Sequence, residues 1–259
     1  MSAAPLLSVQ DLTVRFRADS GWMTAIEEVG FDLMQGENLG IVGESGSGKS
    51  VTALSILRLH ARTTTAIPKG RILYDGRDLL TMPERELRAV RGGEIAMIFQ
   101  EPMSSLSPVH TVGEQIMEVL RLHRAMSRRA ARIRCVEPLD QVEIPEPAHA
   151  VDRYTFEFSG GMRQRVMIAM ALACDPALLI ADEPTTALDV TTQAEVLDLI
   201  RRLQREKGMA VMFITHDMGV VAEMADEVLV GYRGKIVEAG PVDGIFHAPS
   251  ITVALSEDF

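Results

Sequence analysis

The octapeptide GESGSGKS at residues 43–50 constrains this chain more than any other feature, because it fits the pattern G-x-x-x-x-G-K-[ST] at every fixed position. The apolar run at 38–42 predicts a buried strand before it, and residues 51–57 predict the start of a helix after it. Glycines in such a loop let successive backbone N–H groups turn toward phosphate oxygens, and the helix presents the positive end of its dipole to the same anion. The sequence therefore predicts a phosphate-binding loop between a strand and a helix.

Two side chains of this loop have predicted roles in handling a nucleoside triphosphate. Lys49 supplies a positive charge for the β- and γ-phosphates, and the Ser50 hydroxyl is placed to ligate Mg²⁺. The alternative interpretation is a glycine-rich turn without a ligand, and the flanking strand and helix argue against it. The residues predicted to contact the nucleotide are those of the loop and the one after it: Gly43, Glu44, Ser45, Gly46, Ser47, Gly48, Lys49, Ser50 and Val51.

Length and composition bound the class of protein. The 259 residues suffice for one large α/β domain, alone or with a small subdomain, and 47% apolar with 24% charged residues is ordinary for a globular protein. The net charge of −10 argues against nucleic acid as the main partner. Cys135 and Cys174 are too far apart for a metal-ligand spacing or a disulfide framework. We find neither a signal peptide nor a run long enough to span a bilayer, so a membrane role would require a partner.

Periodicity along the chain predicts three kinds of segment. Alternating residues predict antiparallel strands near the N-terminus, and a helical pattern fills residues 101–160, which we interpret as a helical subdomain inserted into an α/β core. The strands are expected at 7–16, 24–29, 70–77, 95–99 (as a central strand), 177–181, 209–214, 227–230 and 235–238. The helices are expected at 162–173 and 193–207, and in the inserted segment around Ile116, Val119, Leu120 and Leu122 and from Ser127.

Asp182 and Glu183 follow one of the buried strands. In a P-loop protein, an aspartate at such a position completes the Mg²⁺ shell, usually through water. Glu183 then lies one residue closer to the γ-phosphate and is able to orient an attacking water. Taken alone, the pair could equally be part of an ordinary loop, and the P-loop elsewhere in the chain favours the catalytic interpretation.

At this point the chain resembles the ATP-binding subunits of ABC transporters over nearly its whole length. The resemblance rests on several motifs in the family's order: Phe16 at the adenine-stacking position, the P-loop, Gln100 in the Q-loop, SGGMRQR at 159–165 as the signature, Asp182 and Glu183 as the Walker B end, ALD at 187–189 as the D-loop, and His216 as the switch histidine. Phe158 replaces the usual leucine before the signature, which predicts some packing strain, and Met162 replaces the usual glutamine.

The resemblance implies a role for each motif. Gln100 supports the Mg²⁺ shell with Ser50 and Asp182 and relays the nucleotide state, and His216 contacts the γ-phosphate. The residues expected to act in catalysis are Glu183, His216, Lys49 and Gln100. The residues expected to bind ATP outside the P-loop are Phe16 and, on the ATP of a second chain, Ser159, Gly160 and Gly161. Two chains would therefore pack head to tail around two ATP molecules.

Three segments are similar to one branch of that family, the dipeptide, oligopeptide and nickel importers: residues 98–108, 161–173 and 234–240. This implies ATP hydrolysis that powers peptide import, with membrane permease subunits, a periplasmic solute-binding protein and a second identical or paralogous ATPase subunit as partners. The chain would lie peripherally on the cytoplasmic face of the inner membrane. We expect the ATP-binding domain at 6–250 and a short divergent tail at 251–259, and we expect the permease to dock around 102–112, with Met103, Leu106 and Val109.

Three alternatives remain open. The solute could be nickel or another small molecule handled by the same branch. The chain could be a soluble ABC ATPase of DNA repair or translation, although it lacks the tandem domains or long coiled coils usual there. It could also be a nucleotide-binding regulator without catalysis, against which the presence of Glu183 and His216 argues.

Overall fold

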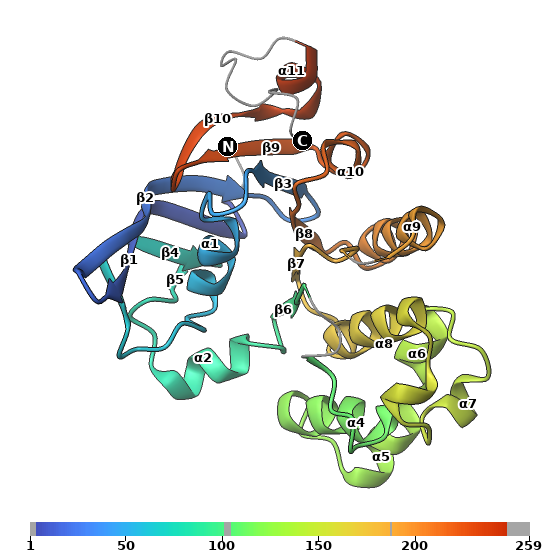
Figure 1. Cartoon of the computed structure of the whole chain (residues 1–259). Helices are drawn as coiled ribbons and strands as arrows, with labels where there is room; N and C mark the ends of the chain where they lie inside the picture. Colours follow the sequence, from blue (N-terminus) through green and yellow to red (C-terminus); the bar gives the residue numbers. More distant parts are fainter. Residues whose placement is uncertain (1–3, 101–104, 187, 248–259) are drawn as a thin grey trace. The chain divides into compact units, whose positions relative to one another are not determined.

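The computed structural model describes residues 4–100, 105–186 and 188–247, which form two compact units (Figure 1). Unit 1 contains the chain up to Leu87 and from Ala210 onward, and unit 2 is Arg88–Met209. The predicted α/β class, with antiparallel and parallel strand pairing, is confirmed. Met103, Ala187 and the tail at 251–259 lie outside the described residues.

Unit 1 begins with an antiparallel sheet whose strand order is β2-β1-β4-β5. Its strands are β1 (Leu7–Ala18), β2 (Gly21–Leu33), β4 (Thr65–Tyr74) and β5 (Arg77–Asp78). Within β1, Leu7 alternates with Val9, and Leu12 with Val14, and all four side chains are buried. The register of β1 against β2 shifts between Val9 and Leu12 and again before Val14, as a bulged strand does. The predicted N-terminal strands are thus present.

In the second sheet of unit 1, β3 (Asn38–Gly43) is the strand that leads into the P-loop, and it has a neighbouring strand on each side. On its two sides β3 pairs in parallel with β8 (Ala210–Ile214) and β9 (Glu227–Tyr232). A tight turn at Arg233 and Gly234, both with positive φ, returns β9 into the antiparallel β10 (Lys235–Pro241). The helices are α1 (Lys49–Ile56), α10 (Met218–Met224), α11 (Val242–His247) and α2 (Glu84–Val90), which continues into unit 2.

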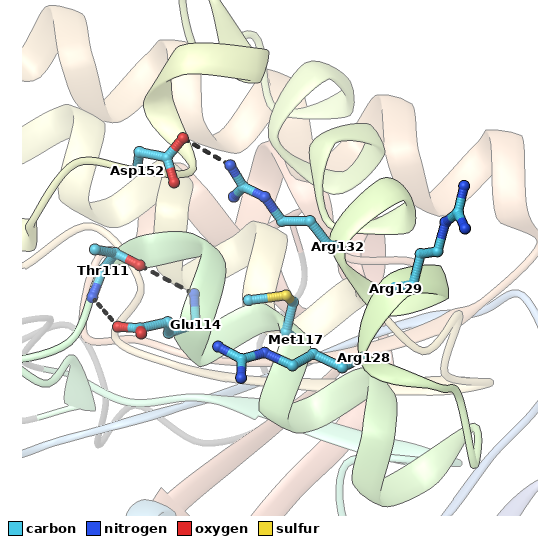
Figure 2. Close-up of a pocket in the computed structure, with 7 residues that line it drawn as sticks. All are labelled: Thr111, Glu114, Met117, Arg128, Arg129, Arg132 and Asp152. Carbon is cyan, nitrogen blue, oxygen red and sulfur yellow. Dashed lines mark hydrogen bonds and ion pairs between the residues drawn. The ribbon is translucent and has the colours of Figure 1, made fainter.

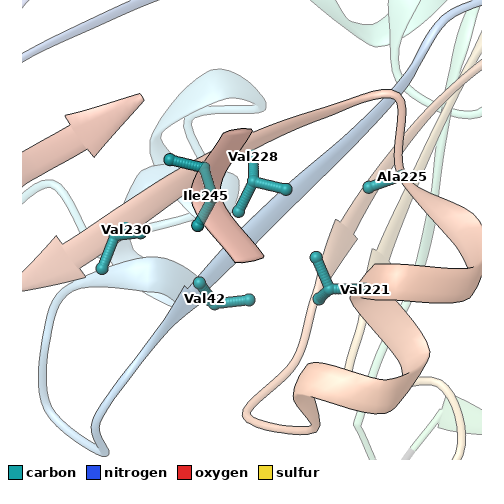
Figure 3. Packing of buried hydrophobic residues seen from close by; sticks show 6 residues of the cluster. All are labelled: Val42, Val221, Ala225, Val228, Val230 and Ile245. Carbon is teal, nitrogen blue, oxygen red and sulfur yellow. The ribbon is translucent and has the colours of Figure 1, made fainter. Parts of the chain in front are cut away.

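A small apolar cluster holds this sheet against the C-terminal helices (Figure 3). Val42 of β3 packs with Val228 and Val230 of β9, and with Val221 of α10 and Ile245 of α11. There is little room for a larger residue here, because a Cβ at Gly40 would lie 3.1 Å from Val221 Cγ1. Since Val42 directly precedes Gly43, this packing fixes the point at which the P-loop leaves the sheet.

Unit 2 contains the parallel pair β6 (Ile95–Ile98) and β7 (Leu178–Asp182) and most of the helices. The helices are α4 (Val112–His123), α5 (Arg128–Arg134), α6 (Val136–Gln141), α7 (Pro147–Ala150), α8 (Gly160–Leu172) and α9 (Val190–Lys207), with a 3-10 turn at Thr155–Glu157. Caps expected from the sequence are in place: Ser127 begins α5, and Gly208, with a φ of 61°, ends α9. No described helix is long and apolar enough to cross a membrane.

Two sequence-based expectations in unit 2 are wrong. The strand at 95–99 is expected to be central, but among the described strands β6 pairs only with β7. Its last predicted residue, Phe99, follows the strand and is 39% exposed. Leu122 was grouped with the apolar face of α4, yet it is 74% exposed while Ile116 and Leu120 are buried. Leu122 is two positions after Leu120, and such a step turns a side chain to the other side of a helix.

Candidate functional site

The P-loop of unit 1 depends on glycines at two close approaches. A Cβ at Gly43 would lie 2.1 Å from the carbonyl oxygen of Gly231, and a Cβ at Gly48 would lie 2.3 Å from Ile26 Cγ2. Both glycines have positive φ, 148° and 96° respectively. Gly46 also has a positive φ, 80°, but nothing lies within 4 Å of where its Cβ would be. The loop is therefore packed at both ends and open at its middle.

The interior of the loop holds a cation and an unsatisfied hydroxyl. Lys49 is 8% exposed, and its ammonium donates to the carbonyl oxygen of Gly43 and, at 2.9 Å, to that of Glu44. Ser47 is 6% exposed, and its Oγ has no hydrogen-bond partner among the described residues. Buried polar groups are seldom left without partners, so an orphan beside a buried cation suits a bound anion. These residues fit the phosphates of a nucleotide.

Parallel pairing of β3 and β8 brings His216 to the same edge of the sheet as the P-loop. Ile41 and Ile214 are partners in register, and the Thr215 N–H donates to the Ile41 carbonyl at 3.3 Å. His216 is exposed, between the end of β8 and the cap of α10. That cap is Asp217, whose Oδ1 accepts from the Gly219 N–H at 2.8 Å. The switch position therefore lies in the short connection between β8 and α10.

Phe16 is half-buried on β1 and contacts one neighbouring aromatic ring. The His60 ring meets it edge to face, with centroids 5.1 Å apart and an interplanar angle of 78°. His60 Nε2 in turn lies 3.1 Å from the Val51 carbonyl and 3.1 Å from Ser55 Oγ, both on α1. His60 thus connects Phe16 to the helix that follows the P-loop. The sequence pattern gave no signal for this histidine.

In unit 2, parallel strand pairing likewise brings Gln100 and Glu183 together. Ile98 of β6 and Ala181 of β7 are parallel partners, so the residues after both strands lie at one edge. Gln100 Nε2 donates to Glu183 Oε2 at 2.8 Å, and Thr186 Oγ1 donates to the same oxygen at 2.8 Å. Glu183 also has a positive φ of 47°. The structure therefore joins two predicted residues and adds Thr186, which the sequence analysis missed.

The oxygen donors predicted for Mg²⁺ are distributed between the two units. Asp182 ends β7 and is 7% exposed, and Ser50 lies in the first turn of α1. No group of three or more histidine, cysteine or carboxylate side chains in the described chain is arranged to hold a metal ion. Mg²⁺ commonly binds through one or two protein ligands, substrate phosphates and water, and a site of that kind needs no preformed cluster. Taken singly, Ser50 and Asp182 each carry an oxygen donor of the kind that Mg²⁺ prefers.

The signature residues form the N-terminus of α8, and its two glycines differ. Ser159 is the N-cap and accepts from the Met162 N–H at 3.3 Å. Nothing lies within 4 Å of a Cβ at Gly160, whereas a Cβ at Gly161 would lie 2.6 Å from Thr192 Cγ2 on α9. Gly160 therefore leaves the helix end open to a ligand, and Gly161 allows α9 to approach.

Thr192 also contacts the D-loop aspartate. Asp189 is the N-cap of α9, and its carboxylate accepts from the Thr192 N–H at 3.0 Å and from the Thr192 hydroxyl at 2.7 Å. These hydrogen bonds lower the pKa of Asp189 below its ordinary value, and the bond from the Thr192 backbone N–H has the largest effect. Thr192 therefore lies between the D-loop and the signature.

Phe158 and Gln164 lie on either side of the signature glycines. Phe158 is 2% exposed, and the Arg153 guanidinium lies over its ring at 4.4 Å from the centroid, a cation–π contact. Gln164 is 2% exposed, and its amide donates to the carbonyl oxygen of Pro184, directly after Glu183. The buried amide links the signature helix to the Glu183 turn. In the sequence, the only feature that pointed to Gln164 was its place in the polar segment after the signature glycines.

Comparison with known proteins gives consistent results. The family described as ABC transporter matches residues 26–186. A protein named as a peptide import ATP-binding protein of Brucella abortus (strain 2308) is 53% identical over 249 residues, which are 96% of this chain and 75% of that protein. The peptidoglycan transport ATP-binding protein YejF of Agrobacterium fabrum is 57% identical over 245 residues, 95% of this chain and 45% of that protein. The dimeric, post-hydrolysis structure of the ATP-binding cassette MJ0796 with ADP and Pi superposes with a TM-score of 0.80 at 28% identity, covering 91% of this chain and 98% of that one.

Proposed function

The chain belongs to the ABC transporter family, and we propose from this premise that it hydrolyses ATP to power peptide import through separate permease subunits. The observation that carries the proposal is the set of motifs in folded form: the P-loop with its buried cation, and the pair of Gln100 and Glu183 joined by a hydrogen bond of 2.8 Å. The names of the similar proteins support peptides or related compounds as the solute class. Nickel or another small solute is the alternative.

Within this proposal each group acts according to its chemistry. The P-loop amides and the Lys49 ammonium bind the phosphates, and Phe16 stacks on adenine. Ser50, Asp182 and Gln100 would hold Mg²⁺, which would neutralise charge on the phosphates when bound. Glu183 accepts a proton from water and orients it, and His216 donates a hydrogen bond to the γ-phosphate. The open end of α8 at Gly160 is suited to the ATP of a second subunit, so we propose an active dimer.

Glu183→Gln tests the catalytic part of this proposal. We expect turnover to fall by a factor of about 10² to 10⁴, because the amide cannot accept the proton of water. ATP binding should persist, because the P-loop is unchanged, and size-exclusion chromatography with ATP should show a trapped dimer. The exposed Glu118→Gln on α4 is the matched control and should hydrolyse ATP normally. Near-normal hydrolysis by Glu183→Gln would remove Glu183 from the mechanism.

The permease partner requires an exposed docking surface, and the structure changes the expected one. Leu106 is only 5% exposed, so it is part of the core and cannot be a contact residue, while Val109 is 73% exposed. Thr111, two residues after Val109, forms an isolated β-bridge with Tyr154, the first residue of an aromatic pair. The rings of Tyr154 and Phe156 are stacked with centroids 5.5 Å apart, and the residues are 40% and 62% exposed.

A cavity of about 600 Å³ lies between α4 and α5, and Thr111 is among the residues that line it (Figure 2). Its carboxylates are engaged: Asp152 pairs with Arg132 at 2.6 Å, and Glu114 caps α4 by accepting from the Thr111 N–H at 3.0 Å. Arg128 also lines the cavity, and its guanidinium has no hydrogen bond or ion pair with any described residue. We propose that a permease segment with apolar side chains and a carboxylate binds here, at Val109, Tyr154, Phe156 and Arg128.

The double variant Val109→Asp and Phe156→Asp tests this docking surface. Because both side chains are exposed, the fold and the ATPase activity of the isolated chain should be retained, while transport by the reconstituted complex should be lost. Met23→Asp introduces the same charge at an apolar residue that is 59% exposed in unit 1, and should transport normally. Normal transport by the double variant would contradict the surface. Tight binding of the wild-type chain to protein-free liposomes would contradict recruitment to the inner membrane by the permease.

A further inference from the structure

The turn that follows β7 holds Glu183 through both its backbone and its side chain. The Thr186 N–H donates to the Glu183 carbonyl at 3.2 Å, which closes the turn over residues 183–186. Glu183 has a φ of 47°, a conformation that residues other than glycine adopt at a cost and that surrounding contacts must maintain. Behind the turn, the buried Gln164 amide holds the Pro184 carbonyl. The turn that begins at Glu183 is therefore held by a backbone hydrogen bond at Glu183 and by the Gln164 amide at Pro184.

Two donors also converge on one oxygen of its carboxylate. Gln100 Nε2 and Thr186 Oγ1 both lie 2.8 Å from Glu183 Oε2, one donor coming from the end of β6 and the other from the turn itself. Hydrogen bonds to a charged oxygen are shorter and stronger than those between neutral groups. Two of them from different directions restrict both the rotamer of Glu183 and the plane of its carboxylate.

The two donors differ in what else they do. Under the proposed function, on which this inference rests, Gln100 also serves the Mg²⁺ shell and must turn toward the nucleotide. Thr186 has no such second role, and it is tied to Glu183 by the backbone hydrogen bond of the same turn. We propose that Thr186 is a positioning residue for the reaction: it keeps Glu183 oriented toward water when Gln100 leaves it for the nucleotide. Gln100 is then the exchangeable restraint and Thr186 the permanent one.

A purely structural role for Thr186 would predict equal losses of turnover in its valine and serine variants. The residue is exposed, and the backbone N–H that closes the turn survives any substitution except proline. Valine keeps the shape of threonine without its hydroxyl, and serine keeps the hydroxyl. If the hydroxyl orients Glu183, valine lowers turnover and serine does not, with the unfolding midpoint unchanged in both variants.

The experiment compares Thr186→Val and Thr186→Ser with the wild-type chain in steady-state ATP hydrolysis. For Thr186→Val we expect kcat to fall about 10- to 100-fold, the loss of one hydrogen bond to a charged group, with KM for ATP within about twofold. Thr186→Ser should stay within about threefold of the wild type in kcat. Thr81→Val is the control, because Thr81 is an exposed turn threonine of unit 1 whose hydroxyl contacts only the Asp78 carbonyl, at 3.4 Å, among the described residues. It should leave kcat unchanged.

A double-mutant cycle with Glu183→Gln tests whether Thr186 acts through Glu183. In the Glu183→Gln background, Thr186→Val should cause no further loss of the residual turnover, since the group it positions no longer accepts a proton. An equal loss in both backgrounds, unchanged kcat in Thr186→Val, or equal losses for valine and serine would each overturn the inference. Absence of hydrolysis by the wild-type chain would instead contradict the proposed function itself, and this inference with it.

Discussion

At the scale of single residues, the P-loop glycines illustrate how one motif meets two different physical demands. Gly43 and Gly48 are needed because neighbouring atoms occupy the space of a side chain: a Cβ would lie 2.1 Å and 2.3 Å, respectively, from the nearest of them. Gly46 is needed for its positive φ alone, since the space around it is open. The consensus pattern fixes Gly43 and Gly48 and leaves the position of Gly46 open. Packing against Gly231 and Ile26 accounts for the two fixed glycines.

This distinction predicts different effects for two alanine variants. Gly46→Ala should cost about 1–2 kcal/mol of unfolding free energy, the strain of a left-handed alanine, and should weaken ATP binding because the methyl group stands on the open side of the loop. Gly43→Ala should cost about 3 kcal/mol or more, because the methyl group meets a backbone carbonyl of β9 that cannot move alone. Urea unfolding of unit 1 and titration with a fluorescent ATP analogue measure both effects. Equal destabilisation by the two substitutions would contradict the packing argument.

At the scale of elements, two parallel strand pairs place most of the predicted polar residues. Pairing of β3 with β8 brings His216 to the edge where the P-loop begins, and pairing of β6 with β7 brings Gln100 to Glu183. These outcomes were predictable, because apolar runs of strand length each end in a polar residue and parallel strands align their carboxyl ends. The antiparallel strands and the caps at Ser127, Ser159 and Gly208 were predictable for similarly local reasons.

Other features depend on contacts that no local pattern encodes. The edge position of β6 depends on which strands pair, and its four apolar residues would suit a central strand equally well. Helix α10 was not predicted; it has only seven residues, and its burial against Val42 is a tertiary contact. Thr186 was not predicted because its proposed role depends on the direction of one hydroxyl group. Gln164 was not predicted because a glutamine in a polar segment is expected to be exposed, and it becomes buried only when the helix packs. Residues of this kind become visible only in three dimensions.

At the scale of the whole molecule, the predicted groups are divided between two compact units. Unit 1 carries Phe16, the P-loop and His216, and unit 2 carries Gln100, Glu183 and the signature. Each unit has its own buried residues, and the chain passes between them after Leu87 and after Met209. Nucleotide binding through the P-loop should therefore stabilise unit 1 first. Nucleotide would stabilise unit 2 only indirectly, through those of its side chains that respond to the nucleotide.

The chain contains separate reporters for this last prediction. Its single tryptophan, Trp22, lies in unit 1 and is 53% exposed, and its two cysteines, Cys135 and Cys174, lie in unit 2 and are fully buried. Burial raises the pKa of both thiols, so in the folded state few thiolates form and labelling should be slow until unit 2 opens. We expect Trp22 fluorescence and thiol labelling to report different urea midpoints in the absence of nucleotide.

Added ATP should then separate the two midpoints further. At a hundredfold excess over its Kd, a ligand that binds only the folded state stabilises it by about 2.7 kcal/mol, and this shift should appear mainly in Trp22 fluorescence. Lys49→Ala is the control: it removes the cation of the P-loop, and ATP should no longer move the Trp22 transition. Coincident transitions that ATP shifts together would mean that the chain unfolds as one cooperative block. In that case the two units would be compact parts of the structure without being separate units of unfolding. Binding of ATP at the P-loop would then stabilise the Glu183 turn as well.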